Sequence, residues 1–150
     1  PSAYVPHGQD WQPGFRDLPF RQGRYSHDPE RIQLQDAWFT KNPALQIGSP
    51  TTRWLYDAAI SCQLVNKPAY LKAITVPLLI AKAGEDQIVS NHMIDRAVKL
   101  LPDVQTIEIP GAKHEILMES NEYRQVFLDH FFTFVEENVL KKSDRGMTKF

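Results

Sequence analysis

The sequence has few of the features that would mark a secreted, membrane-spanning or nucleic-acid-binding protein. Its single cysteine, Cys62, cannot form a disulfide bond within the chain. Its longest apolar run is about six residues, whereas a helix that spans a bilayer needs about 18. A net charge of −1 gives it no electrostatic reason to bind nucleic acid. No two histidines have the spacing of metal ligands, and we expect neither a metal nor a cofactor.

The composition suits one globular unit whose first half differs from its second. Of its 150 residues, 42% are hydrophobic and 23% charged, which excludes a disordered chain. Frequent proline and glycine before about residue 29 predict irregular structure. Asp28 as N-cap, with Pro29 following, predicts a helix to about Lys41, and a second helix is predicted over about 51–65. We therefore expect residues 1–73 to be irregular and then mostly helical.

From Ile74 onward, strands alternate with helices, a pattern typical of a parallel sheet covered by helices. Two strands are too few for a complete α/β sheet, so we expect the chain to be part of a longer protein. An open sheet edge would also allow copies of the chain to associate. The predicted elements of residues 74–150 are a strand over 76–81, a helix from Ser90 to about Leu101, a strand over 104–109 and a helix from Ser120 or Asn121.

Each of these two strands is followed by a residue suited to acid–base chemistry. Asp86 follows the first strand and its glycine, Gly84, and His114 follows the second strand and Gly111. Loops at the carboxyl ends of parallel strands lie on one edge of the sheet, so the two side chains are expected to be close. A histidine can move protons in acyl transfer while a carboxylate fixes its tautomer. Asp86 and His114 are therefore the candidate catalytic acid and base.

Other interpretations of these residues remain open. An aspartate after a strand often caps a helix or forms a turn, and an isolated histidine often lies at the surface. Glu85 is an alternative acid, and Glu115 is expected to act as a structural partner in the following turn. Adjacent carboxylates cannot flank a glycosidic bond, so a glycosidase pair is not expected. The remaining histidines are expected to be surface or packing residues: His7, His27, His92 and His130.

The chain order of acid and then base matches that of α/β-hydrolases, in which a nucleophilic serine comes earlier. That serine lies in a Gly-x-Ser-x-Gly motif, and no serine here has glycines two residues away on both sides. We therefore expect the nucleophile to be missing and this chain alone to be inactive.

Three segments resemble the bacterial lysophospholipase L2 group of monoglyceride-lipase-like α/β-hydrolases. They are the acid region over 83–96, the histidine loop over 111–117 and a Gly-x-Pro-Thr-x-x-Trp segment over 48–54. The resemblance covers about residues 4 to 138. It implies that Asp86 is the triad acid and His114 the triad base. It also implies the carboxyl-terminal part of an α/β-hydrolase fold, with two parallel strands and flanking helices, preceded by a mostly helical cap.

The resemblance assigns residues 1–73 to this cap, which covers the acyl-chain pocket in the family. Trp38 and Trp54 are then expected to line an apolar tunnel, unless they form the core of the cap itself. Ile88 and Val89 are plausible contacts for an acyl chain, although packing is a close alternative. The implied substrates are lysophospholipids, monoacylglycerols or small esters. The implied location is the cytoplasm or the periphery of the bacterial inner membrane.

Three functions follow from these observations. The first is an esterase in which this chain is completed by the missing amino-terminal half of the hydrolase. The second is a non-catalytic module that associates with itself or with a partner. The third is a peptidase or thioesterase that has the same fold. The shape of the pocket would decide the third, and the sequence does not define it.

Overall fold

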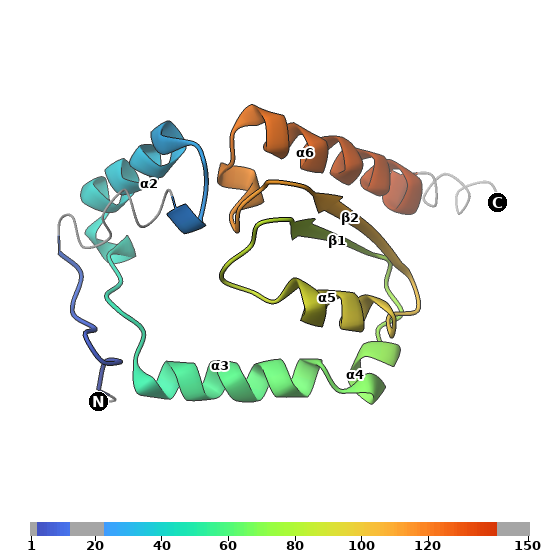
Figure 1. Cartoon of the computed structure of the whole chain (residues 1–150), viewed down its shortest axis with the longest axis horizontal. Helices are drawn as coiled ribbons and strands as arrows, with labels where there is room; N and C mark the ends of the chain where they lie inside the picture. The colour runs from blue at the N-terminus through green and yellow to red at the C-terminus, as the bar shows by residue number, and fades with distance from the viewer. Residues whose placement is uncertain (1–2, 13–22, 141–150) are drawn as a thin grey trace, which may run out of the picture.

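The computed structural model describes residues 3–12 and 23–140. Figure 1 shows two parallel strands between two helices, with the preceding helices arranged around them. The first elements are α2 (Pro29–Lys41), the short 3-10 helix η1 (Pro43–Leu45), α3 (Thr52–Val65) and α4 (Pro68–Lys72). The later elements are β1 (Leu78–Ala83), α5 (Asn91–Val98), β2 (Val104–Ile109), the 3-10 helix η2 (Ile116–Met118), α6 (Asn121–Val135) and the π-helix η3 (Glu136–Leu140).

The two predicted helices of the first region form where their capping signals place them. The Asp28 side chain accepts a hydrogen bond from the Arg31 amide at the start of α2. The Thr51 side chain does the same for Trp54 at the start of α3. Such caps satisfy backbone donors that the first turn leaves without a partner. The structure adds α4, which the sequence analysis did not predict.

The strands pair in parallel from Leu78 opposite Val104 to Ala83 opposite Ile109. The second strand was predicted with its observed bounds, but the first begins and ends two residues later than the predicted 76–81. Proline has no N–H to donate, and the first amide that joins the ladder is that of Leu78, which donates to Asp103 at 3.0 Å. Within the described residues, this two-stranded parallel sheet with flanking helices confirms the predicted α/β class.

The described hydrophobic core lies at the carboxyl ends of the strands. Ala83, Ile109 and Ala112 are buried there. Side chains of η2, α6 and β2 pack against them, with Tyr123 and Phe127 contributed by α6. Figure 1 shows α6 on one side of the strands and α5 on the other. This packing fixes the ends of both strands, from which the two candidate catalytic residues follow.

Part of the segment that was predicted to be irregular, residues 13–22, lies outside the described residues, as do residues 141–150. The division into a cap over 1–73 and a core part over 74–150 stays a prediction.

Candidate active site

Asp86 and His114 lie next to each other at the carboxyl edge of the two strands. The His114 Nδ1 atom is 2.9 Å from the Asp86 Oδ2 atom. The Asp86 side chain is 5% exposed and that of His114 is 28% exposed. In the tautomer with the proton on Nδ1, the ring donates to the carboxylate and leaves Nε2 for another partner. The carboxylate is thus shielded while the imidazole remains partly accessible.

The second oxygen of the Asp86 carboxylate is held by the loop that follows it. Oδ1 accepts hydrogen bonds from the amides of Ile88 at 2.7 Å and Val89 at 3.0 Å. Burial by itself raises the pKa of Asp86, but these two bonds and His114 outweigh burial and lower its pKa below the ordinary value. The carboxylate is therefore ionised at neutral pH and oriented before any ligand binds.

Two backbone bonds join the acid loop to the histidine loop. The Gly84 amide donates to Ile109 at 3.0 Å, and the Glu85 amide donates to Ala112 at 2.9 Å. A Cβ atom at Gly84 would lie 3.0 Å from the Pro110 Cα atom, so only glycine allows this close approach without displacement. The two catalytic candidates are therefore fixed relative to each other by backbone as well as by side chains.

The neighbouring carboxylates occupy different positions. Glu85 is exposed, and Asp86 is the residue within hydrogen-bonding distance of His114. Glu115 takes part in the following turn through its backbone, whose carbonyl accepts from the Met118 amide at 2.8 Å.

Glu119 is a buried carboxylate that the sequence analysis did not identify. It is 0% exposed and accepts from the Lys113 amide directly before His114, at 2.8 Å. His27 lies at the surface as expected, but its Nδ1 atom is 2.8 Å from a Glu119 oxygen. The two residues are 92 positions apart in the chain, and no local pattern links them. From sequence alone, a glutamate just before the N-cap of a helix is expected to be exposed.

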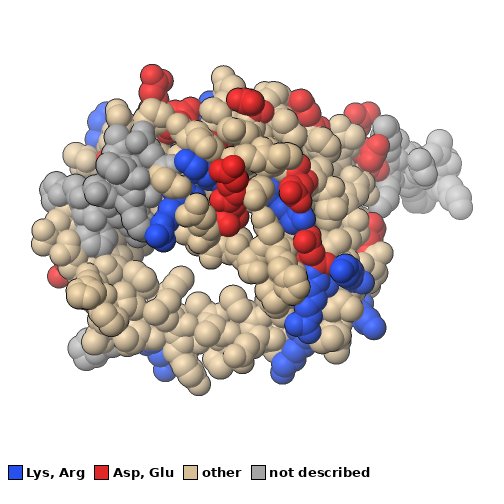
Figure 2. Space-filling view, in the orientation of Figure 1, with Lys and Arg blue, Asp and Glu red and all other residues tan. Residues whose placement is uncertain are grey.

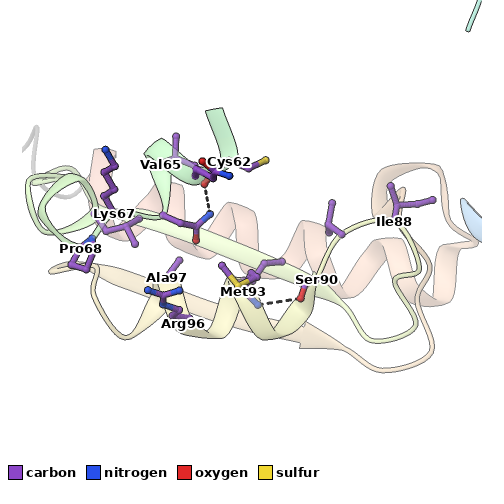
Figure 3. Close-up of a pocket in the computed structure, with 14 residues that line it drawn as sticks. Cys62, Val65, Lys67, Pro68, Ile88, Ser90, Met93, Arg96 and Ala97 are labelled. Carbon is purple, nitrogen blue, oxygen red and sulfur yellow. Dashed lines mark hydrogen bonds between the residues drawn. The ribbon is translucent and has the colours of Figure 1, made fainter. Parts of the chain in front are cut away.

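A cavity of about 780 Å³ lies between the end of α3, α4, α5 and the loop after β1. Figure 3 shows Val65 and Pro68 on one side of it and Met93 and Ala97 on the other. Figure 2 shows that the molecule is also hollowed between α3 and the rest of the chain. Among the described residues that line the cavity, the charged ones are Lys67 and Arg96. The wall is otherwise mainly apolar.

The four predicted substrate contacts fall into two groups. Ile88 and Val89 line this cavity. Trp38 and Trp54 are 58% and 60% exposed and are not among the described residues that line it. Their exposure also argues against a core formed by these two side chains in the described part of the chain. Contact of any of the four with substrate stays a prediction.

The described residues contain neither a metal-binding cluster nor a membrane-spanning helix. No group of three or more histidine, cysteine or carboxylate side chains among them is arranged to hold a metal ion. No helix in the described part of the chain combines the length and apolar character needed to cross a bilayer.

Comparisons with known proteins identify a hydrolase family for this chain. Residues 11–121, well over half of the chain, match the hydrolase family described as serine aminopeptidase, S33. A probable lysophospholipase L2 of Haemophilus influenzae is 33% identical over 94 residues, which are 61% of this chain and 29% of that protein. Lysophospholipase L2 of Escherichia coli K12 is 28% identical over 139 residues, 88% of this chain and 40% of that protein. The chain thus spans less than half the length of these relatives. It belongs to the serine aminopeptidase S33 family, within the lysophospholipase-like α/β-hydrolases.

Proposed function

We propose that this chain supplies the acid and the base of a Ser-His-Asp hydrolase that acts on the acyl ester of lysophospholipids or monoacylglycerols. The observation that carries the proposal is the 2.9 Å contact between His114 Nδ1 and a shielded Asp86 carboxylate. The relatives named lysophospholipase L2 support the ester substrate. The serine and the oxyanion-hole donors belong to a segment outside these 150 residues, so the chain alone is inactive.

Each residue has a defined part in the reaction. The serine hydroxyl attacks the acyl carbonyl carbon while His114 Nε2 accepts its proton. His114 then donates this proton to the leaving alcohol as the ester bond breaks and an acyl-enzyme forms. A water molecule attacks the acyl-enzyme, His114 accepts a proton from the water, and the fatty acid leaves as the serine regains that proton. Asp86 stays ionised throughout and stabilises the imidazolium.

The cavity beside the acid loop supports an apolar acyl group as the bound part of the substrate. Ile88 and Val89 lie two and three residues after Asp86 and line the cavity, whose wall is mainly apolar. An acyl chain bound there would approach the catalytic pair along the same loop. Residues 1–73 act in this proposal as the cap over that chain.

Peptide hydrolysis is the second candidate, because the matching family is described as a serine aminopeptidase. The same three groups can cleave an amide, with His114 donating its proton to the leaving amine. The site geometry does not separate the two reactions, since acid and base are common to both. A substrate panel separates them.

In the test, this chain is fused to the corresponding amino-terminal part of the lysophospholipase L2 of Escherichia coli. Hydrolysis by this hybrid enzyme is then measured. Lysophosphatidylcholine, a monoacylglycerol and an aminoacyl p-nitroanilide form the panel. The proposal predicts hydrolysis of the first two and its loss, by several orders of magnitude, in the His114→Ala variant. Hydrolysis of the anilide alone would support the peptidase. A folded hybrid whose esterase activity survives His114→Ala would exclude the assignment.

A further inference from the structure

The buried Glu119 carboxylate is an ionisable group that the proposed reaction does not use. Its oxygens accept hydrogen bonds from two separate parts of the chain. Oε1 accepts from the Lys113 amide at 2.8 Å and lies 2.8 Å from His27 Nδ1. Oε2 accepts from the His27 amide at 2.8 Å, the Ser26 hydroxyl at 3.3 Å and the Ser120 amide at 3.2 Å. Five donors thus converge on one side chain that is 0% exposed.

The same two segments meet at His114 through their backbones. The His114 amide donates to the Arg24 carbonyl at 3.4 Å, and the Glu115 amide donates to the Tyr25 carbonyl at 2.9 Å. The Tyr25 ring also lies edge-on to the His114 ring, with 6.0 Å between centroids. Three successive amides of the histidine loop are therefore bound, the first of them, that of Lys113, by the buried carboxylate.

The segment that supplies these carbonyl groups is held by the same carboxylate. Residues 24 and 25 run directly into Ser26 and His27, both of which donate to Glu119. The Ser26 hydroxyl shares its single hydrogen between Glu119 at 3.3 Å and the Met118 carbonyl at 2.7 Å, and the His27 ring stacks on Tyr123 with 5.4 Å between centroids. Loss of the carboxylate would consequently loosen both supports of the histidine at once.

We propose that Glu119 is a positioning residue for His114, acting through the Lys113 amide and the 24–27 segment. It does not touch the imidazole, and its effect is transmitted by the backbone. Replacing the charged acceptor weakens the hydrogen bonds of these donors, most of which are partly buried, and this makes the loop more mobile. Misplacement of a catalytic group by about 1 Å can cost on the order of 100-fold in rate. The rate effect rests on the proposed function, whereas the effect on the loop does not.

The charge state of Glu119 fits this role. Burial by itself raises its pKa, but the bonds from the His27 and Lys113 amides and from the His27 ring outweigh burial, and the pKa lies below the ordinary value. The carboxylate is therefore ionised at neutral pH and can accept from all these donors. A neutral amide of the same shape would present an NH₂ group to some of them.

The test uses the 150-residue chain itself and needs no catalytic activity. Glu119→Gln keeps the shape of the side chain and removes its charge. Glu122→Gln, at an exposed carboxylate in the first turn of α6, is the matched control. NMR measures hydrogen exchange of the Lys113 amide and the Nδ1-bound proton of the His114 ring.

The proposal predicts that Glu119→Gln speeds exchange of the Lys113 amide by about tenfold and weakens the His114 Nδ1 proton signal. Glu122→Gln should match the parent chain in both signals. Unchanged signals in a folded Glu119→Gln chain would overturn the proposal.

If Glu119→Gln does not fold, the His27→Phe variant serves as the test of the role of Glu119. It keeps an aromatic ring to stack on Tyr123 and removes one donor to the carboxylate. Exchange at Lys113 should then be faster than in Glu122→Gln, and equality with that control would overturn the proposal.

Activity adds a second readout in the hybrid enzyme. Glu119→Gln should lower kcat by on the order of 10- to 100-fold and leave KM nearly unchanged. A hybrid without esterase activity would count against the proposed function, while the exchange measurement would still decide the role of Glu119. A rise of KM with unchanged kcat would contradict positioning.

Discussion

Replacing Asp86 by asparagine tests the acid–base pair with the smallest change of shape. The carbonyl oxygen of the new side chain could still accept from the Ile88 and Val89 amides, which now donate at 2.7 and 3.0 Å. The remaining NH₂ group would face His114 Nδ1 and could only donate to it. The ring would then carry its proton on Nε2, where the proposed reaction needs a free acceptor.

The expected loss is far larger in activity than in stability. The corresponding change in a serine protease triad lowers kcat by about 10⁴-fold through the wrong tautomer. The same factor here would correspond to about 5.4 kcal/mol of transition-state stabilisation. The three hydrogen bonds of the Asp86 carboxylate become neutral, but each still has a partner, so the free energy of unfolding should fall by only about 1–3 kcal/mol.

The assay is kcat/KM for ester hydrolysis by the hybrid enzyme, with urea unfolding of the same samples. Glu85→Gln is the matched control, since it removes the adjacent carboxylate, which is exposed. It should retain most of the activity. An Asp86→Asn enzyme that keeps more than about a tenth of the parent activity would refute the reasoning. So would a Glu85→Gln enzyme that loses as much as Asp86→Asn.

Two further predictions concern stability. Gly111 has φ = +79°, and a Cβ atom there would lie 3.1 Å from the Tyr123 hydroxyl. Gly111→Ala should therefore lower the free energy of unfolding, measured by urea titration, by about 1–3 kcal/mol. Gly23→Ala is the control and should change this free energy little, because no atom lies within 4 Å of the Cβ position at Gly23. Equal effects of the two substitutions would contradict the strain argument. Acid should destabilise the chain because Asp86 and Glu119 have pKa values below their ordinary 3.8 and 4.5. Their stabilisation is complete above those ordinary values and is lost as pH falls through the lowered pKa values. Urea unfolding between about pH 6 and pH 2 should show this loss of stability, and the loss should be smaller in Glu119→Gln than in the parent chain. Identical pH profiles for the parent chain and Glu119→Gln would contradict the prediction.

Structural features that are set by a few neighbouring residues could be predicted from the sequence. Asp28 and Pro29 mark the start of α2, and the structure confirms that helix from cap to end. The strand over 104–109 is likewise confirmed. The positions of Asp86 and His114 after successive strands were enough to predict that the two side chains lie close, because parallel strands end at one edge.

Features that depend on contacts between distant parts of the chain could not be predicted from the sequence. The start of β1 is set by where β2 can pair with it, and the apolar residue Val76 gave no sign of this. Glu119 is buried by donors from residues about 90 positions earlier, although its local sequence suggests an exposed helix start. The exposure of Trp38 and Trp54 also depends on which parts of the chain pack against them. The hydrophobic periodicity of a sequence shows which residues share a helix face, but it does not show which parts of the chain pack against that face.

Labelling with a fluorophosphonate, read by intact mass, tests the central claim most directly. The account assigns the acid and the base to the 150-residue chain and the nucleophile to the amino-terminal half, so it predicts no adduct on this chain. The hybrid with an amino-terminal half should gain one adduct on a serine of the added half, and His114→Ala should abolish it. A stoichiometric adduct on a serine of the 150-residue chain itself would contradict the account.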